Sequence, residues 1–274
     1  MGSVSSPVDS GRKRADALLA TMAGGTYVLI LLGIYTAAIG AGLTCDGRWP
    51  LCDGAVFGLF PANWPSFVEW FHRLVAMITG FLILGGWIVV WRSGRSRRAF
   101  LAMTTAVGLL PVQIWLGAET VLRYEIVTLI AHFLTALVIF SGVILGVVWH
   151  WGLHRFVPSY SRAMLSGTLV LLAPFLVLKP QFLFIHTGAV QMLYYGIGLG
   201  MFVAFMLVAV AGRSHVMREL SAFGVGLMTL QLVVGRLVRS PIIETVDWVG
   251  AGATVLIVLV ALWVVTNIAS DRSS

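Results

Sequence analysis

The chain has 274 residues, of which 59% are hydrophobic and only 11% are charged, and its mean hydropathy is +0.95. A soluble globular chain carries about 25% charged residues, so this composition excludes a soluble domain. The net charge of +7 comes from Lys and Arg in short clusters between apolar runs, which argues against a nucleic-acid-binding face. The sequence therefore predicts an all-α integral membrane protein in a lipid bilayer.

Apolar runs follow one another along the whole chain, and a helix that crosses a bilayer needs about 20 apolar residues. They predict eight transmembrane helices with short connections, at residues 21–43, 67–91, 99–118, 125–149, 162–179, 183–211, 219–237 and 245–268. The first run is too long for the apolar region of a signal peptide, so we expect it to be the first helix. No length remains for a separate soluble domain.

Lys and Arg are divided unequally between the two sides that this topology defines. Twelve fall on the side of the N-terminus and six on the opposite side, where several stand at helix ends from which a long side chain can snorkel. Positive residues in short loops are held in the cytoplasm. We therefore predict a multi-pass protein of the cell membrane with both termini cytoplasmic.

A short internal repeat links the two halves of the chain. Residues 113–117 (QIWLG), at the end of the third predicted helix, are echoed by residues 231–235 (QLVVG), at the end of the seventh. An echo of five residues in an apolar sequence also arises by chance. The interpretation that it favours is a pair of pseudo-symmetric four-helix bundles, residues 1–155 and 156–274.

The six histidines fall into two groups. His72, His132 and His186 stand in the first turns of three predicted helices that run inward from the outer side. At about 1.5 Å per residue, His72 and His132 differ in depth by only about 5 Å. The other three lie at or beside predicted cytoplasmic loops, where we expect solvated side chains: His150, His154 and His215.

Histidines inside a membrane are expensive and often functional, and a neutral imidazole is a good axial ligand of haem iron. The alternative is that each one makes an interhelical hydrogen bond, as such residues do in helical bundles. The set at one depth favours haem ligation by His72 and His132.

Glu69 precedes His72 by three positions, so both side chains project from one face of the helix. A carboxylate beside a metal ligand is compatible with catalysis. It is equally compatible with a carboxylate favoured by the helix macrodipole and paired with Arg73.

Cys45 and Cys52, the only cysteines, lie in the first predicted outer loop, on the oxidising side of the membrane. This placement predicts a disulfide, with either a structural or a redox role. A metal site at the two thiols is not expected, because no further Cys or His stands in the loop to complete four ligands.

Taken together, four elements of the chain resemble the haem A synthase family, membrane enzymes of haem biosynthesis that act in cytochrome oxidase assembly. They are the loop Cys45-x6-Cys52, the motif Glu69-Trp-Phe-His72-Arg73, the motif Leu116-Gly-Ala-Glu-Thr-Val121 and the motif Ala131-His132-Phe133. The resemblance covers most of the chain. It implies two pseudo-symmetric four-helix halves, a substrate haem in one and a haem b cofactor in the other.

The implied reaction is that of an oxidoreductase: oxidation of the C8 methyl group of haem O to a formyl group, giving haem A, by successive hydroxylation. By resemblance, His72 and His132 ligate the substrate haem iron at an outer-side site. Glu69 is the catalytic carboxylate near the reacting methyl group, with Arg73 supporting it, and Cys45 and Cys52 match the outer-loop disulfide of the family.

The second half departs from the family pattern. By resemblance, His186 is the first ligand of the haem b iron, and the second ligand is expected near residues 246–248, but no histidine follows His215. Three outcomes stay open: haem b held by His186 alone, a substitute ligand, or no cofactor haem. The implied partners are a haem O-producing farnesyltransferase, cytochrome oxidase assembly proteins and further copies of the chain, with no nucleic acid.

Two other functions compete with the synthase. A non-enzymatic b-type cytochrome or haem-binding assembly factor needs the histidines but not Glu69. A transporter is disfavoured, because transporter sites lie near the bilayer midplane, whereas the polar residues here gather toward one face.

Overall fold

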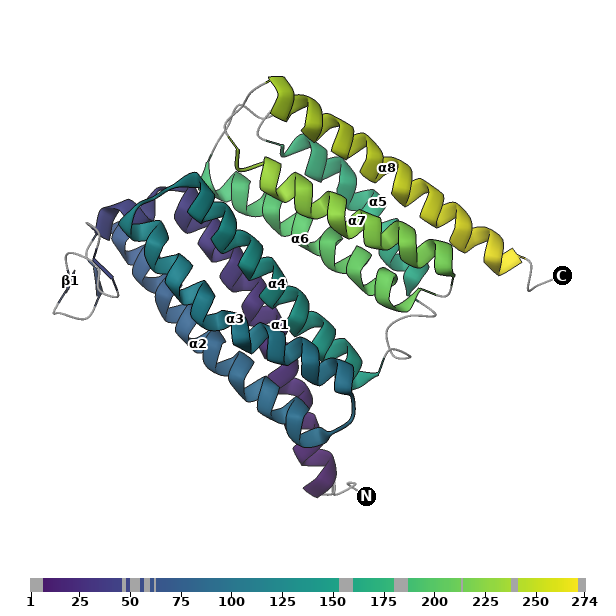
Figure 1. Ribbon diagram of the computed structural model, residues 1–274, viewed down its shortest axis with the longest axis horizontal. Helices are drawn as coiled ribbons and strands as arrows, with labels where there is room; N and C mark the ends of the chain where they lie inside the picture. The colour runs from purple at the N-terminus through teal and green to yellow at the C-terminus, as the bar shows by residue number, and fades with distance from the viewer. Residues whose placement is uncertain are drawn as a thin grey trace, which may run out of the picture. The chain divides into compact units, whose positions relative to one another are not determined.

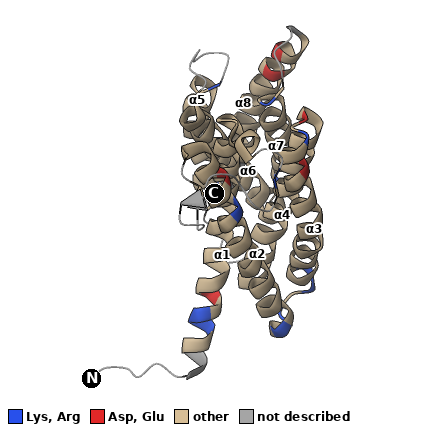
Figure 2. Ribbon diagram, turned by 90° about the vertical axis from the view of Figure 1, so that its left-hand side faces the viewer, with Lys and Arg blue, Asp and Glu red and all other residues tan. Residues whose placement is uncertain are grey.

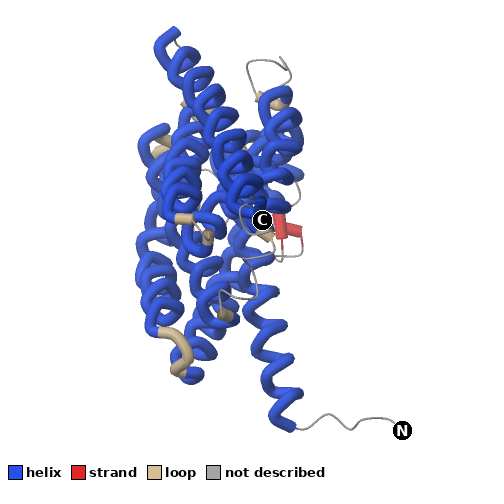
Figure 3. The backbone as a smooth tube through the Cα atoms, turned by 90° about the vertical axis from the view of Figure 1, so that its right-hand side faces the viewer, coloured by secondary structure: helices blue, strands red, loops and turns tan. Residues whose placement is uncertain are grey.

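The computed structural model describes residues 7–45, 48–49, 55–56, 60–61, 63–152, 160–179, 187–212, 214–237 and 241–270. This part of the chain is almost entirely helical (Figures 1 and 3). In chain order the elements are α1 (Pro7–Ala38), η1 (Ala41–Cys45), β1 (Ala55–Val56), β2 (Phe60–Pro61), α2 (Trp64–Ser93), α3 (Arg97–Leu122), α4 (Ile126–Trp151), α5 (Ser161–Val177), α6 (Gly188–Ala211), α7 (His215–Val234) and α8 (Pro241–Ser270).

The helices form two compact units, Met1–Trp151 (unit 1) and Gly152–Ser274 (unit 2). In unit 1, α1 and α3 each contact both α2 and α4. In unit 2, α5 and α7 each contact both α6 and α8. Each unit is therefore a four-helix bundle whose neighbours follow the same order. The pseudo-symmetric relation between the units stays a prediction.

The prediction of an integral membrane protein is confirmed. Within the described residues, seven helices are long and apolar enough to cross a membrane. The eighth, α5, has 17 residues and measures about 26 Å, less than the roughly 30 Å of a hydrocarbon core. In unit 1, Figure 2 shows Lys and Arg near the start of α1 and around the turn from α2 to α3.

The helix ends differ from those predicted from hydropathy, because caps and turns set them. The first helix begins at Pro7 rather than residue 21, since polar residues continue it beyond the apolar run. At the start of α2, the side chain of Asn63 accepts a hydrogen bond from the Ser66 amide at 2.9 Å. Thr187 caps α6 in the same way, so this helix begins at Gly188 rather than residue 183.

A short hairpin and a single-turn helix lie between α1 and α2. Strands β1 and β2 are antiparallel, with Ala55 opposite Pro61 and Val56 opposite Phe60. The 3-10 helix η1 ends at Cys45, which is fully buried. Cys52 lies outside the described residues, so the disulfide that it was expected to form with Cys45 stays a prediction.

The tightest apolar packing in unit 1 lies toward the ends of α2 and α4 and the start of α3. Glycines allow the close approach there: a Cβ atom at Gly142 of α4 would lie 2.7 Å from the Ala102 carbonyl oxygen of α3. The buried cluster consists of Leu19, Met22, Ile83, Val90, Ala99, Met103, Ala106, Ile139, Val143 and Val147. The predicted site residues lie in the other half of the same helices.

Candidate functional site

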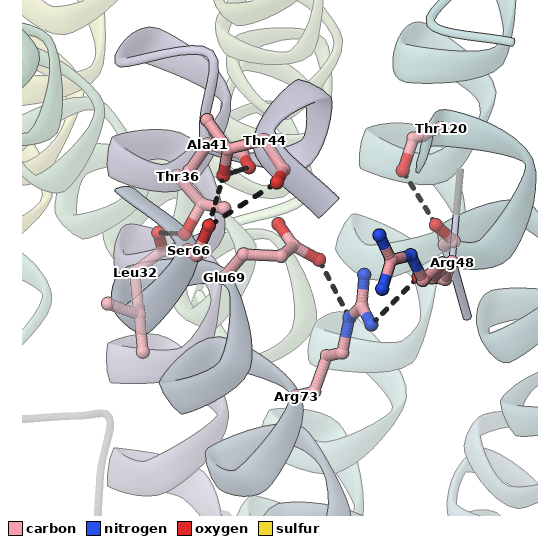
Figure 4. A network of polar contacts seen from close by, with 10 residues as sticks. Leu32, Thr36, Ala41, Thr44, Arg48, Ser66, Glu69, Arg73 and Thr120 are labelled. Carbon is pink, nitrogen blue, oxygen red and sulfur yellow. Dashed lines mark hydrogen bonds and ion pairs between the residues drawn. The ribbon is translucent and has the colours of Figure 1, made fainter. Parts of the chain in front are cut away.

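Glu69 and Arg73 lie one turn apart on α2 and form an ion pair. Arg73 Nε donates to Glu69 Oε1 at 2.9 Å, and Glu69 is only 6% exposed. Arg73 Nη1 also donates to the carbonyl oxygen of Arg48 at 3.4 Å (Figure 4). Arg73 therefore joins the carboxylate to the segment between the two cysteines.

The second carboxylate oxygen of Glu69 faces the 3-10 helix. A Cβ atom at Gly42 would lie 3.7 Å from Glu69 Oε2 and 3.7 Å from Val121 Cγ2 of α3. Among the residues that the structure describes, Oε2 accepts no hydrogen bond. One oxygen of the carboxylate is thus held by a guanidinium, while the lone pairs of the other remain available.

A hydroxyl network fixes η1 against the start of α2. The Ser66 hydroxyl donates to Thr44 Oγ1 at 2.8 Å, and the Thr44 hydroxyl donates to the Ala41 carbonyl oxygen at 2.8 Å (Figure 4). Ser66 is fully buried, and Thr44 is partly buried. The network positions Gly42, and hence the surroundings of Glu69.

The His72 ring packs against a glycine of α1. A Cβ atom at Gly33 would lie 3.0 Å from His72 Cε1 and 3.5 Å from its Nε2. The other ring nitrogen, Nδ1, is buried and has no hydrogen-bond partner among the described residues. A buried polar atom without a partner is uncommon and points to a ligand that the protein holds.

The His132 ring packs in the same way against a glycine of α3. A Cβ atom at Gly117 would lie 3.2 Å from His132 Cε1. Gln113, one turn earlier on α3, places its side-chain nitrogen 3.3 Å from His132 Nε2. Both histidines therefore lie where a helix meets a glycine on the preceding helix of the chain.

The two histidines stand at similar depth in unit 1. His72 is eight residues after Trp64 and His132 is six residues after Ile126, so their depths are about 12 and about 9 Å at 1.5 Å per residue. The depth of His72 differs from the predicted depth mainly because α2 begins at Trp64, three residues before the start that hydropathy predicts. Two imidazoles from two helices of one bundle form a donor set that fits haem iron.

Unit 2 does not repeat this donor set within its described residues. Gln231 on α7 is the counterpart of Gln113, but its side chain donates to the Gly250 carbonyl oxygen at 3.3 Å and to Thr254 Oγ1 at 2.7 Å. Gln113 faces a histidine 19 residues later, whereas Gln231 faces a glycine 19 residues later. Gly250 lies two to four residues beyond the region 246–248 where sequence spacing places the second ligand. His186 lies outside the described residues, so haem b ligation there stays a prediction.

A buried ion pair occupies the end of α5 and the first turns of α8 instead. Lys179 Nζ lies 2.8 Å from Asp247 Oδ1, with the two side chains 0% and 3% exposed. The ammonium group is also 5.6 Å from the centroid of the Trp248 ring. Lys179 therefore does not extend to water from this helix end, because it pairs with a buried carboxylate.

Three residues of the site were not found from the sequence: Gly33, Gly42 and Gln113. Gln113 and Gly117 did appear in the internal repeat, but only as an echo and not as neighbours of His132. Gln113 could have been found from its spacing of four residues from Gly117, which places both residues on one face of α3. Gly33 and Gly42 had no such signal.

Comparison with known proteins gives two kinds of relative. No protein-family model matches the chain. The chain is 37% identical over 134 residues to the protoheme IX farnesyltransferase of Halobacterium salinarum, which is 48% of this chain and 28% of that protein. It is 33% identical over 120 residues to the heme A synthase of Bacillus licheniformis, 43% of this chain and 39% of that protein.

A second heme A synthase, from Alkalihalophilus pseudofirmus, is 30% identical over 143 residues, 50% of this chain and 48% of that protein. The chain thus spans less than half the length of these curated relatives. Over about half of its own length it is similar to haem A synthases.

Proposed function

We propose that this multi-pass membrane protein is a haem A synthase, starting from its similarity to such enzymes over about half of its length. One observation carries the proposal: His72 lies on the same face of α2 as the buried carboxylate of Glu69, and a second histidine stands at similar depth on α4. The similarity to farnesyltransferases covers 28% of those proteins, and we do not extend their transferase activity to this chain.

In this proposal, His72 and His132 bind the iron of the substrate, haem O, from opposite faces of the ring. Their similar depth supports the assignment, as does the close packing of each imidazole against a glycine of the neighbouring helix. Gly33 and Gly117 let each imidazole lie close to the neighbouring helix, which fixes the ring planes. Bis-histidine binding then fixes the substrate, so that one edge of the macrocycle faces α2.

Glu69 is the proposed catalytic group. Conversion of the C8 methyl group to a formyl group removes two electron pairs, which pass to an external two-electron acceptor. Water adds to the carbon after each oxidation, and the resulting diol loses water. Each oxidation leaves an electron-poor carbon and releases a proton. The carboxylate stabilises the positive charge and accepts the proton through Oε2, while Arg73 holds Oε1 in place.

The surroundings of the site follow from the same proposal. We place the reaction on the outer side of the cell membrane and both termini in the cytoplasm, because twelve of the eighteen Lys and Arg residues fall on the side of the N-terminus. A disulfide between Cys45 and Cys52 would close the outer loop beside Arg48. A haem O-producing farnesyltransferase is the expected supplier of substrate, and cytochrome oxidase assembly the expected consumer of haem A.

Identification of the bound haems tests the proposal directly. The full chain is expressed with a source of haem O, purified in detergent, and its extracted haems are identified by mass. We expect haem A or its hydroxylated precursor in the wild type, and almost no haem in a variant carrying both His72→Ala and His132→Ala. Haem b alone in the wild type would instead identify a cytochrome or haem carrier.

A substitution at Gly33 tests the contact with His72. In Gly33→Ala the new Cβ atom stands 3.0 Å from His72 Cε1, so the ring must shift by a few tenths of an ångström. We expect haem affinity, measured by titration with ferric haem, to fall about twofold to tenfold.

The matched control is Gly24→Ala, on the same helix, where a Cβ atom meets nothing within 4 Å. Both substitutions raise helix propensity equally, so a difference between them reports the contact with the ring. Equal affinities in the two variants would show that Gly33 does not position His72.

A further inference from the structure

The two histidines of unit 1 differ in what touches their nitrogens. His132 Nε2 lies 3.3 Å from the side-chain nitrogen of Gln113, which stands four residues before Gly117. On α1, the residue four before Gly33 is Leu29, which has no polar group to offer His72. An amide hydrogen bond therefore reaches one imidazole of the pair and not the other.

This contact occupies the lone pair that a metal would need. An amide nitrogen can only donate a hydrogen bond, so His132 Nε2 is the acceptor and the ring proton lies on Nδ1. That tautomer is the one that coordinates iron through Nε2. The amide thus keeps His132 in the right protonation form but blocks its donor atom.

Gln113 itself is only partly satisfied in this position. Its side-chain oxygen, Oε1, is buried and has no hydrogen-bond partner among the described residues. The counterpart in unit 2 is held more firmly, because Gln231 donates to two acceptors, at 2.7 and 3.3 Å. A single long hydrogen bond and an unpaired oxygen make Gln113 easy to displace.

We propose that Gln113 is a positioning residue that caps His132 Nε2 in the haem-free protein and turns away when the second axial bond forms. This inference rests on the proposed haem site. It makes ligation sequential: iron bonds first to His72, whose ring no side-chain amide caps, and His132 follows once the amide has left. Formation of the first bond, to His72, is then fast, and formation of the second bond, to His132, is the slower step.

Rapid mixing of ferric haem b with the haem-free, detergent-solubilised full chain separates the two steps. The first bond is read from the five-coordinate absorbance spectrum and the second from the six-coordinate spectrum. In Gln113→Leu, which copies Leu29, we expect the second phase to accelerate about threefold to tenfold, the equivalent of one hydrogen bond, with the first phase unchanged. Gln191→Leu in unit 2 is the matched control and should behave as the wild type.

A second variant, Gln113→Glu, should change the rate of the second phase in the opposite direction. In Gln113→Glu the carboxylate can only accept a hydrogen bond, so it favours the His132 tautomer with the proton on Nε2, which cannot bond to iron, and the second phase should slow. A merely structural role for Gln113 would instead lower the thermal midpoint and change both phases in the same direction in both variants. That outcome would overturn the inference, as would a second phase that neither variant alters.

Two further variants separate this inference from the proposed function. His132→Ala should retain the first phase and lose the second, and His72→Ala should lose the fast first phase. If neither histidine affects either phase in the wild-type background, the haem site and the inference fail together. If both histidines behave as expected and Gln113→Leu leaves the second phase unchanged, only the inference fails.

Discussion

Replacing Glu69 with glutamine is expected to stop haem A formation and to leave haem O bound to the protein. Glutamine has nearly the same shape, and its oxygen can still accept the hydrogen bond that Arg73 donates at 2.9 Å. What it loses is the negative charge and the ability to take up a proton. Removal of a general base lowers a rate by about 10²- to 10⁴-fold. The ratio of haem O to haem A, measured by mass after coexpression with a haem O source, checks the result.

The control for this variant is Glu219→Gln. Glu219 Oε2 lies 3.3 Å from His215 Nδ1, one turn earlier on α7, and both side chains are well exposed. Its haem ratio should match the wild type. If Glu69→Gln also produces haem A at the wild-type level, Glu69 has no catalytic role, and a haem carrier or cytochrome becomes the better interpretation.

Removal of Lys179 is expected to cause a large loss of stability. In Lys179→Met the carboxylate of Asp247, which is 3% exposed, remains buried without its 2.8 Å partner. Loss of one member of a buried ion pair destabilises a protein by about 3–5 kcal/mol. Thermal unfolding of the detergent-solubilised chain should show a midpoint many degrees below that of the wild type.

The double variant Lys179→Met, Asp247→Leu should recover most of that loss, because it leaves no buried charge. Arg123→Met is the comparison at an exposed pair: Arg123 is 69% exposed and lies 3.2 Å from Glu119, so its removal should change stability by less than about 1 kcal/mol. Additive losses in the double variant would mean that Lys179 and Asp247 contribute independently and not as a pair.

Hydropathy predicts the helices well because the bilayer selects for long apolar runs. It predicts their ends poorly, since Asn63 and Thr187 set the starts of α2 and α6 through single hydrogen bonds that an average over many residues does not register. The first helix illustrates the same limit. Its apolar part is visible in the sequence, but the polar turns from Pro7 onward resemble a cytoplasmic tail.

The contacts of the candidate site were also only partly predictable from the sequence. Glu69 and Arg73 were predictable as neighbours because both stand on one helix at a spacing of four residues. The packing of Gly33 on His72 depends on how two helices rotate against each other, which no periodicity in either helix specifies. The pair Lys179–Asp247 spans 68 residues and two helices, so the sequence showed only a lysine at a helix end.

In unit 1 the buried apolar cluster and the polar residues of the candidate site lie in different halves of the helices, so folding of the bundle need not depend on a bound substrate. The glycine-lined contact at Gly142 and the buried cluster around Met103 and Val143 involve none of the side chains proposed to bind haem. We therefore expect the bundle to assemble in the membrane without its substrate. Under the proposed function, haem would then enter a binding site that is already folded.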